Sequence, residues 1–259
     1  MSLSPQQVER YARHLVLKEI GGGGQQALLN AKVLIIGAGG LGCPVAMYLA
    51  AAGIGTIGIV DDDLVSLSNL QRQVLFTTKD VGKPKTESAI SKLRQLNPDP
   101  IFHQHNLRLD ENNIDQIISR YDYIIDGCDN FPTRFLVNQK SHQYGKTLIS
   151  GAVGKFDGQV SAHSFASPEN KTACYQCLVP AAPPEAQTCE QVGVVGALTG
   201  IIGSVMALEC IKLITDNGQS LLGRLLIWDG LGAVCRTVKL NPDPDCSICG
   251  KTHNPIIMK

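Results

Sequence analysis

The stretch from residue 32 to residue 72 constrains the fold more than any other part of this 259-residue chain. Residues 33–36 (VLII) form a short apolar run, rich in β-branched side chains, which predicts a buried parallel strand. Gly37, Gly39 and Gly42 follow it and complete a G-x-G-x-x-G pattern. Because these residues lack Cβ atoms, the loop can turn tightly and let a phosphate approach the backbone.

A helix and a second strand complete this unit. Pro44 suits the first turn of the helix, Gly53 suits its C-terminal stop, and the apolar residues 57–60 predict the next strand. Asp61 follows at about the place, roughly 20 residues after the glycines, where a βαβ unit puts the acid that holds a ribose hydroxyl. A purely structural turn would explain the glycines alone, whereas the ordered set favours a nucleotide site.

Composition narrows the class of protein. Lys and Arg together number 23, as do Asp and Glu, so neither nucleic acid nor an anionic membrane surface is an expected partner. The N-terminus has charges spread through a helical pattern and no apolar signal core, which predicts a cytoplasmic protein. The uncharged run 191–208 borders on transmembrane length. Its acidic flanks favour a buried helix instead, against which another element packs at Gly196, Gly200 and Gly203.

Polar and basic residues after the second strand suit a polyphosphate. The SNLQRQ segment supplies Asn69, Gln71 and Arg72, and Lys85 begins a helix predicted over residues 85–96, whose N-terminal dipole favours an anion. A dehydrogenase would need hydride chemistry beyond a dinucleotide fold. A solvated basic turn is the alternative interpretation of these residues.

Further elements are predicted on either side of this unit. Asp129, just past the end of a predicted buried strand, can bind Mg²⁺ together with substrate phosphates, although an Asp-Asn pair is also an ordinary turn and helix cap. The predicted elements are an amphipathic helix at 4–20, a glycine break at 21–24, a short helix at 25–29, strands at 101–105, 123–126 and 147–150, a helix near 111–120, and a hairpin turn through Asp157-Gly158.

Four of the nine cysteines stand in two C-x-x-C pairs. Cys174 and Cys177 form one pair, and Cys246 and Cys249 form the other. Four thiolates in two such pairs meet the tetrahedral preference of structural Zn²⁺, and their long separation would make the metal a link between distant segments. Redox or disulfide use is the alternative.

A fifth cysteine, Cys189, follows a stretch rich in Pro and Ala that resembles a mobile crossing loop. A thiol near the start of a helix can have a lowered pKa and act as a nucleophile. Most lone cysteines are small apolar fillers, and that interpretation covers the remaining ones, Cys43, Cys128, Cys210 and Cys235.

Taken together, these motifs resemble the MoeB/ThiF/HesA adenylyltransferases, bacterial relatives of ubiquitin-activating enzymes. The resemblance covers nearly the whole chain. The motifs that carry it are GAGGLG at 37–42, Asp61, SNLQRQ at 68–73, VGKPK at 81–85, CDN at 128–130, CYQC at 174–177, TCEQVG at 188–193 and CSIC at 246–249.

The resemblance implies ATP-dependent adenylation of the C-terminal glycine of a small ubiquitin-like sulfur carrier ending in Gly-Gly. It implies that Asp61 holds the ribose, that Arg72 and Lys85 contact phosphates, and that Asp129 holds Mg²⁺. Cys189 aligns with a thiol proposed to take up the acyl group. The residues implied to bind the nucleotide are Gly37, Gly39, Gly40, Asp61, Ser68, Asn69, Leu70, Gln71, Arg72, Lys85, Asp129 and Asn130.

The resemblance also implies a homodimer in which Arg13 reaches the partner's ATP, and a separate protein as sulfur donor, since no rhodanese domain follows Cys249. The expected fold is a Rossmann-like, doubly wound α/β domain with a largely parallel sheet extended by antiparallel strands and a structural zinc site. We expect one adenylating domain, with an N-terminal helix at 1–30, a nucleotide-binding half at about 31–150, and a carrier-binding and zinc half at about 151–259.

The expected carrier is the molybdopterin-synthase small subunit. A thiamine-pathway carrier or another ubiquitin-like protein is the nearest alternative. Two hypotheses from other classes are a nicotinamide-dependent oxidoreductase and a non-catalytic nucleotide-binding scaffold. The SNLQRQ segment with Lys85 disfavours the first, and the set of Arg72, Lys85 and Asp129 disfavours the second.

Overall fold

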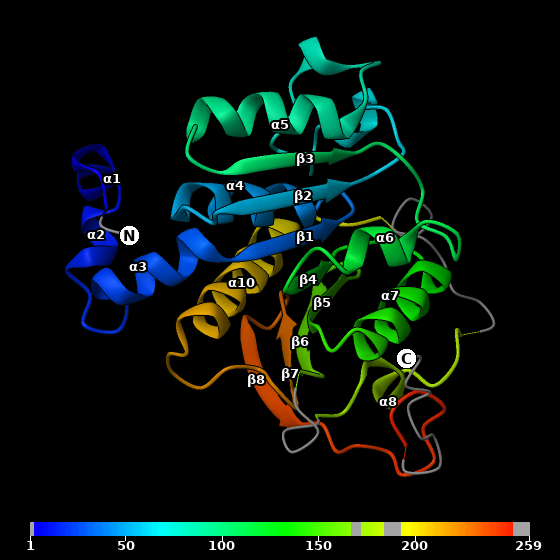
Figure 1. Ribbon diagram of the computed structural model, residues 1–259. Coiled ribbons are helices and arrows are strands. Elements are labelled where there is room, and N and C mark those ends of the chain that lie inside the picture. The colour runs from blue at the N-terminus through cyan, green and yellow to red at the C-terminus, as the bar shows by residue number, and fades with distance from the viewer. Residues whose placement is uncertain (1–2, 167–171, 184–192, 251–259) are drawn as a thin grey trace.

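The computed structural model describes residues 3–166, 172–183 and 193–250 (Figure 1). Its centre is a sheet of eight strands in the order β3-β2-β1-β4-β5-β6-β7-β8. The strands are β1 (Lys32–Ile36), β2 (Thr56–Val60), β3 (Ile101–His105), β4 (Tyr123–Asp126), β5 (Thr147–Val153), β6 (Asp157–Ser164), β7 (Arg224–Asp229) and β8 (Val234–Lys239).

The first five strands are parallel and the last three run antiparallel to their neighbours. The strand β1 has β2 on one side and β4 on the other, so the chain order reverses there. Ligands of open α/β sheets bind beside the carboxyl ends of the strands at such a reversal. The predicted doubly wound sheet with an antiparallel extension is therefore confirmed.

Helices cover both faces of the sheet (Figure 1). Alternate residues of β1 enter two separate apolar cores: Val33 and Ile35 lie in one, Leu34 and Ile36 in the other. This explains why the strand is an uninterrupted apolar run. The helices are α1 (Pro5–Arg10), α2 (Ala12–Leu15), α3 (Gly21–Asn30), α4 (Gly42–Ala52), α5 (Lys85–Leu96), α6 (Ile114–Ile118), α7 (Phe131–Gln143), α8 (Tyr175–Leu178) and α10 (Gly196–Thr215), with 3₁₀ turns η1 (Leu67–Asn69) and η2 (Thr78–Asp80).

The apolar helix α10 passes a length and composition test for a membrane span, but it packs against α4, β5 and β6. A Cβ on Gly203 would lie 2.4 Å from Cγ of Pro44 in α4, and one on Gly196 would lie 2.2 Å from the carbonyl oxygen of Gln71. Close packing at these two glycines is confirmed. At Gly200 the prediction is wrong for the described part of the chain, where no residue outside the helix's own backbone lies within 4 Å of a Cβ built there.

The N-terminal prediction needs correction. The expected helix at 4–20 is two short helices, α1 and α2, and the expected glycine break at 21–24 is the first turn of α3. Gly21, with φ of 54°, still redirects the chain. Gly24 packs inside the fold, because a Cβ there would lie 3.0 Å from Cγ2 of Ile20 and 3.4 Å from Cγ2 of Thr215. Packing against α10 therefore outweighs the low helix propensity of glycine.

The predicted position of the hairpin turn, at Asp157-Gly158, is also wrong. The strand β5 continues to Val153, the turn occupies residues 154–156, and Asp157 and Gly158 begin β6. A Cβ on Gly158 would lie 2.3 Å from Cγ1 of Ile202. The glycine is therefore needed for the approach of α10 and not for the turn. The helix expected near 111–120 is the shorter α6, and the helix predicted at 85–96 has the expected bounds.

Candidate functional site

A cavity of about 630 Å³ lies beside the carboxyl ends of the parallel strands. This volume suits a small-molecule or nucleotide ligand. Its walls come from the glycine loop after β1, the acidic segment after β2, the loop after β4, and the end of β5. The predicted residues that line it are Gly37, Gly39, Gly40, Asp61, Asn69, Arg72, Lys85, Asp129 and Asn130, whereas Ser68, Leu70 and Gln71 do not line it.

Each glycine of the loop has a different reason to lack a side chain. Gly37 has φ of 90°, which disfavours other residues. A Cβ on Gly42 would lie 1.8 Å from the carbonyl oxygen of Gly37, so close packing of the helix start against the strand requires glycine there. A Cβ on Gly39 would meet no atom closer than Nε2 of Gln73 at 3.9 Å among the described residues beyond its chain neighbours, which leaves room for a ligand to approach the backbone.

Asp61 fastens the acidic segment to the glycine loop. Its Oδ2 accepts a hydrogen bond from the backbone N–H of Ala38 at 2.7 Å, and its Oδ1 accepts one from the backbone N–H of Asp63 at 2.9 Å. Burial raises the pKa of this carboxyl, and the nearby Lys85 ammonium opposes that rise. Asp61 thus presents a desolvated carboxylate at the cavity wall, which suits hydrogen bonds from ligand hydroxyls.

Lys85 supplies a buried cation to the same wall. Its Nζ lies 2.7 Å from Oδ2 of Asp63 and 4.0 Å from Oδ1 of Asp61. The side chain of Asp63 is 65% exposed, so this partner can move away when an anionic ligand arrives. Arg72 donates through Nη1 to the carbonyl oxygen of Ser68 at 3.2 Å, which holds a second cation at the cavity.

The loop after β4 places one exposed carboxylate at the cavity. Asp129 is exposed and lines the cavity. Asn130 is the N-cap of α7 and accepts a hydrogen bond from the backbone N–H of Thr133 at 3.0 Å. Asn69 is the last residue of the turn η1, and its Oδ1 accepts a hydrogen bond from the backbone N–H of the N-cap residue Ser66 at 3.3 Å. Both asparagines therefore have structural contacts in addition to their places on the wall.

Several cavity residues were not predicted from the sequence, among them Gln73, Arg134, Tyr175 and Thr199. Thr199 lies against Gly40, where a Cβ would be 3.0 Å from its Cγ2. Arg134 is 6% exposed and forms an ion pair with Asp126 at 3.1 Å. In the sequence it stands in a polar helix, where an arginine usually indicates a solvated face, so no local signal identified it.

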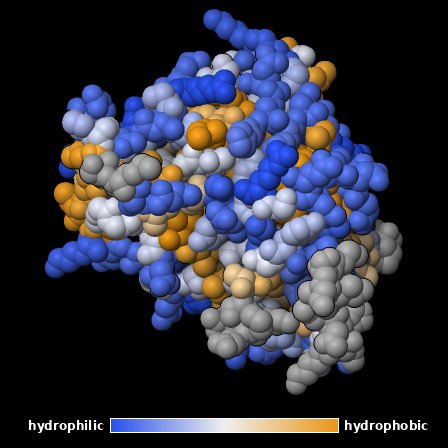
Figure 2. All heavy atoms as spheres, viewed as in Figure 1, coloured by the Kyte–Doolittle hydropathy of each residue, from blue (hydrophilic) through white to orange (hydrophobic). Residues whose placement is uncertain are grey.

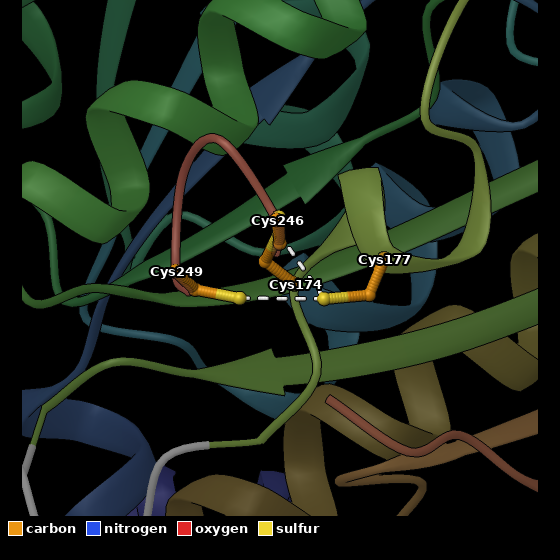
Figure 3. A group of neighbouring side chains, drawn as sticks. All are labelled: Cys174, Cys177, Cys246 and Cys249. Carbon is orange, nitrogen blue, oxygen red and sulfur yellow. Dashed lines mark hydrogen bonds between the residues drawn. The ribbon is translucent and has the colours of Figure 1, made fainter. Parts of the chain in front are cut away.

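The four predicted metal-binding cysteines converge (Figure 3). Their sulfur atoms all lie within 4.8 Å of one another, with Cys174 3.5 Å from Cys246 and Cys177 3.3 Å from Cys249. A tetrahedral site with Zn–S bonds near 2.3 Å separates its sulfurs by about 3.8 Å, so this set fits zinc. Hydrogen bonds from neighbouring thiols, that of Cys174 first, lower the pKa of Cys249 to about 5.

One predicted catalytic residue, Arg13, is not brought to the cavity. Arg13 is exposed on α2, which lies with the other N-terminal helices near the amino ends of the strands, away from the cavity (Figure 1). It therefore does not reach the cavity of its own chain. Cys189 lies outside the described residues.

Comparison with known proteins identifies the family. Residues 11–248 match the ThiF family, which covers most of the chain. The chain belongs to the ThiF family. It is 42% identical over 253 residues to the SAMP-activating enzyme E1 of Haloferax volcanii, covering 97% of this chain and 92% of that protein. It is also 42% identical to the sulfur carrier protein adenylyltransferase of Thermus thermophilus, covering 96% and 93%.

A further relative and a solved structure are also similar to this ThiF-family chain. The probable adenylyltransferase/sulfurtransferase MoeZ of Mycobacterium tuberculosis is 45% identical over 245 residues, which cover 94% of this chain and 62% of MoeZ. A solved structure of E. coli MccB with ATP superposes with a TM-score of 0.77 at 25% identity, covering 93% of this chain and 73% of that one. The protein is an adenylyltransferase.

Proposed function

We propose that this protein uses ATP to adenylate the C-terminal carboxylate of a small ubiquitin-like sulfur carrier ending in Gly-Gly. The main observation is the cavity that gathers Asp61, Arg72, Lys85 and Asp129 beside the glycine loop. The names of the relatives, which include a SAMP-activating enzyme and a sulfur carrier protein adenylyltransferase, support the substrate class. They favour this function over the oxidoreductase and scaffold hypotheses.

The reaction needs positioning and charge neutralisation more than acid–base chemistry. A carboxylate oxygen of the carrier attacks the α-phosphorus, a new P–O bond forms, and pyrophosphate leaves with the electron pair of the broken P–O bond. The attacking group is already an anion, so no residue has to remove a proton. Asp61 holds the ribose hydroxyls, and Arg72 and Lys85 stabilise the negative charge that develops on the phosphates.

Asp129 is the proposed magnesium ligand. Its exposed carboxylate at the cavity wall suits an ion that takes one or two protein carboxylates and completes its shell with phosphates and water. Bound there, Mg²⁺ would supply further neutralisation of phosphate charge. Gly37, Gly39, Gly40, Asn69 and Asn130 complete the proposed nucleotide-binding set at the cavity. Ser68, Leu70 and Gln71, which do not line the cavity, belong to this proposed set as neighbours of Asn69 and Arg72 in the same segment.

Cys174, Cys177, Cys246 and Cys249 are the proposed zinc ligands, because their sulfur separations suit a tetrahedral site. The ion would link α8 to the segment after β8. We propose that the whole chain is one adenylating domain in which residues from about 151 onward bind the carrier.

We also propose a homodimer in which Arg13 of one chain serves the nucleotide of the other. Arg13 is too distant from the cavity of its own chain to serve it, as described above. Apolar side chains gather over the N-terminal helices (Figure 2), and Val8, Val16 and Leu17 are exposed there, which suits burial between two copies. Arg13→Ala and Arg72→Ala proteins should each be inactive, yet recover activity when mixed and allowed to exchange subunits; failure to recover after proven exchange contradicts this.

Cys189 is the proposed acceptor of the acyl group after adenylation, and a separate protein is the proposed sulfur donor. Because adenylation itself needs no enzyme nucleophile, Cys189→Ala should retain pyrophosphate exchange and lose only later acyl or sulfur transfer. A Cys189→Ala protein without exchange activity would contradict this division of roles.

The molybdopterin-synthase small subunit is our preferred carrier, supported by the similarity to MoeZ, and a thiamine-pathway carrier is the alternative. The deciding experiment measures ATP–pyrophosphate exchange with each purified candidate carrier. We expect exchange only when a carrier ending in Gly-Gly is present. Exchange that ignores the carrier, or binding of NAD with no response to ATP, contradicts the proposed function.

A further inference from the structure

The Arg134 side chain has an unusual set of partners for a charged residue. It lies buried in the first turns of α7, and its guanidinium makes four hydrogen bonds. Nη1 donates to Oδ2 of Asp126 at 3.1 Å and to Oγ of Ser150 at 3.0 Å. Nη2 donates to the backbone carbonyl oxygens of Cys128 and Gly151, the latter at 2.8 Å.

These partners belong to two different walls of the cavity. Cys128 lies in the loop of residues 127–130, here called the Asp129 loop. Gly151 directly precedes Ala152 and Val153, which line the cavity and are here called the β5 wall. Because a planar guanidinium offers donors in fixed directions, it can set the separation of two backbone carbonyls as a lysine cannot. Arg134 therefore joins the carboxylate side of the cavity to the side formed by β5.

We propose that Arg134 is a positioning residue for adenylation: it holds the Asp129 loop and the β5 wall in register, so that Asp129 and the substrate groups bound along β5 meet in a reactive arrangement. This inference rests on the proposed function. It concerns the alignment of the two walls and not Asp61, Arg72 or Lys85, whose hydrogen-bond partners include Ala38, Ser68 and Asp63 respectively.

Other contacts stiffen the same loop. Oδ1 of Asp126 accepts a hydrogen bond from the backbone N–H of Cys128 at 3.1 Å, and Asn130 caps α7 at the far end of the loop. Asp129 is left between these two anchors with its carboxylate exposed. Because both ends are fixed, the direction of that carboxylate depends on where Arg134 holds the Cys128 carbonyl.

Tyr175 supports Arg134 from the other side. The guanidinium carbon lies 5.8 Å from the centroid of the Tyr175 ring, within the range of a cation–π contact. Tyr175 directly follows Cys174, and its backbone N–H donates to Oδ1 of Asn138 at 2.9 Å. The ring that covers Arg134 therefore directly follows a member of the cysteine cluster and is anchored to α7 through Asn138, which connects the proposed zinc site to the geometry of the cavity.

The test compares Arg134→Lys with Lys140→Gln. Lys140 is a matched control, since it is also a buried cation of α7, pairs with Asp115 at 2.7 Å, and does not line the cavity. Carrier-dependent pyrophosphate exchange gives kcat and KM, calorimetry gives the ATP affinity as a function of Mg²⁺ concentration, and thermal unfolding gives stability.

We expect Arg134→Lys to lower kcat about 100-fold, because misplacement by about 1 Å can cost that much, while the KM for ATP at saturating Mg²⁺ stays unchanged. The Mg²⁺ concentration needed for half-maximal ATP binding should rise about 10-fold, the usual effect of losing a group that orients a metal ligand. Lys140→Gln should lower the unfolding temperature and change neither quantity.

If Arg134→Lys resembles Lys140→Gln and loses only stability, the inference is overturned. If Arg134→Lys does not fold, Ser150→Ala decides, since it removes one uncharged partner of Arg134 and should lower kcat about fivefold; an unchanged kcat overturns the inference. If the wild-type protein shows no exchange at all, the proposed function fails, and the Mg²⁺ dependence of ATP binding still tests Arg134 separately.

Discussion

His163 should make this protein sensitive to mild acid. The side chain is fully buried in β6, where Nδ1 bonds the carbonyl oxygen of Ala173 and Nε2 lies 2.9 Å from Oγ of Ser161. A neutral ring satisfies both contacts, because Nδ1–H donates to the carbonyl oxygen and Nε2 accepts from the hydroxyl. Burial lowers the pKa of His163 from 6.5 to about 4, against the opposing effect of the Ala173 hydrogen bond.

The free energy of unfolding should fall as the pH falls, because the unfolded chain binds more protons than the folded chain. Between the two pKa values the His163 ring is protonated in the unfolded chain and neutral in the folded chain. The free energy of unfolding is therefore highest above pH 6.5 and falls as the pH drops toward 4. At about pH 5 the loss amounts to roughly 2 kcal/mol, and it approaches about 3 kcal/mol below the folded-state pKa.

The matched variant is His163→Gln, whose neutral amide can donate to Ala173 and accept from Ser161 without titrating. Denaturant unfolding at about pH 7.5 and about pH 5 should show a fall in the unfolding free energy that is roughly 2 kcal/mol larger in wild type than in the variant. Protonation of the four clustered cysteines changes the unfolding free energy of both proteins equally, so its contribution cancels when the two pH profiles are compared. Parallel pH profiles for the two proteins would refute the reasoning.

Three further predictions concern the metal and the cavity. Cys246→Ser should lose zinc by metal analysis and unfold at lower temperature, since binding energy at such a site is folding energy; zinc-free wild type would contradict this. Gly42→Ala should fail to fold or to bind ATP, because its Cβ would lie 1.8 Å from the Gly37 carbonyl oxygen, whereas Gly39→Ala should keep its unfolding temperature and bind ATP more weakly. Equal unfolding temperatures for the two glycine variants would disprove that contrast. Lys85→Met should lower the exchange rate by about 100-fold or more at unchanged stability; a rate near that of wild type would exclude Lys85 from phosphate stabilisation.

Much of the parallel sheet could be predicted because its signals are local. The strand at 33–36 is apolar on both faces, and the helix stop at Gly53 has φ of 83°, as a left-handed cap requires. The convergence of the two cysteine pairs also followed from residue type and spacing, since two C-x-x-C pairs are a common pattern of tetrahedral zinc ligands.

The remaining features depend on contacts between distant segments. The Asp157-Gly158 pair predicts a turn. Only the structure shows that Gly158 is needed instead because Ile202 of α10 packs closely against it. Arg134 could not be recognised, because two of its partners are backbone carbonyls, which leave no mark on composition or spacing. Likewise, the helical conformation of residues 21–24 depends on α10, which lies against α3 and places Thr215 next to Gly24.

The central claim is that the cavity transfers AMP to a carrier carboxylate, and intact-mass spectrometry tests it most directly. The purified protein, ATP and Mg²⁺ are incubated with a carrier ending in Gly-Gly, and the same carrier without its terminal glycine serves as the control. We predict that the full-length carrier alone gains the mass of one adenylate, and that Arg72→Ala enzyme abolishes the gain. A full-length carrier that stays unmodified while the enzyme binds ATP, or a truncated carrier that is adenylated equally well, would contradict the account.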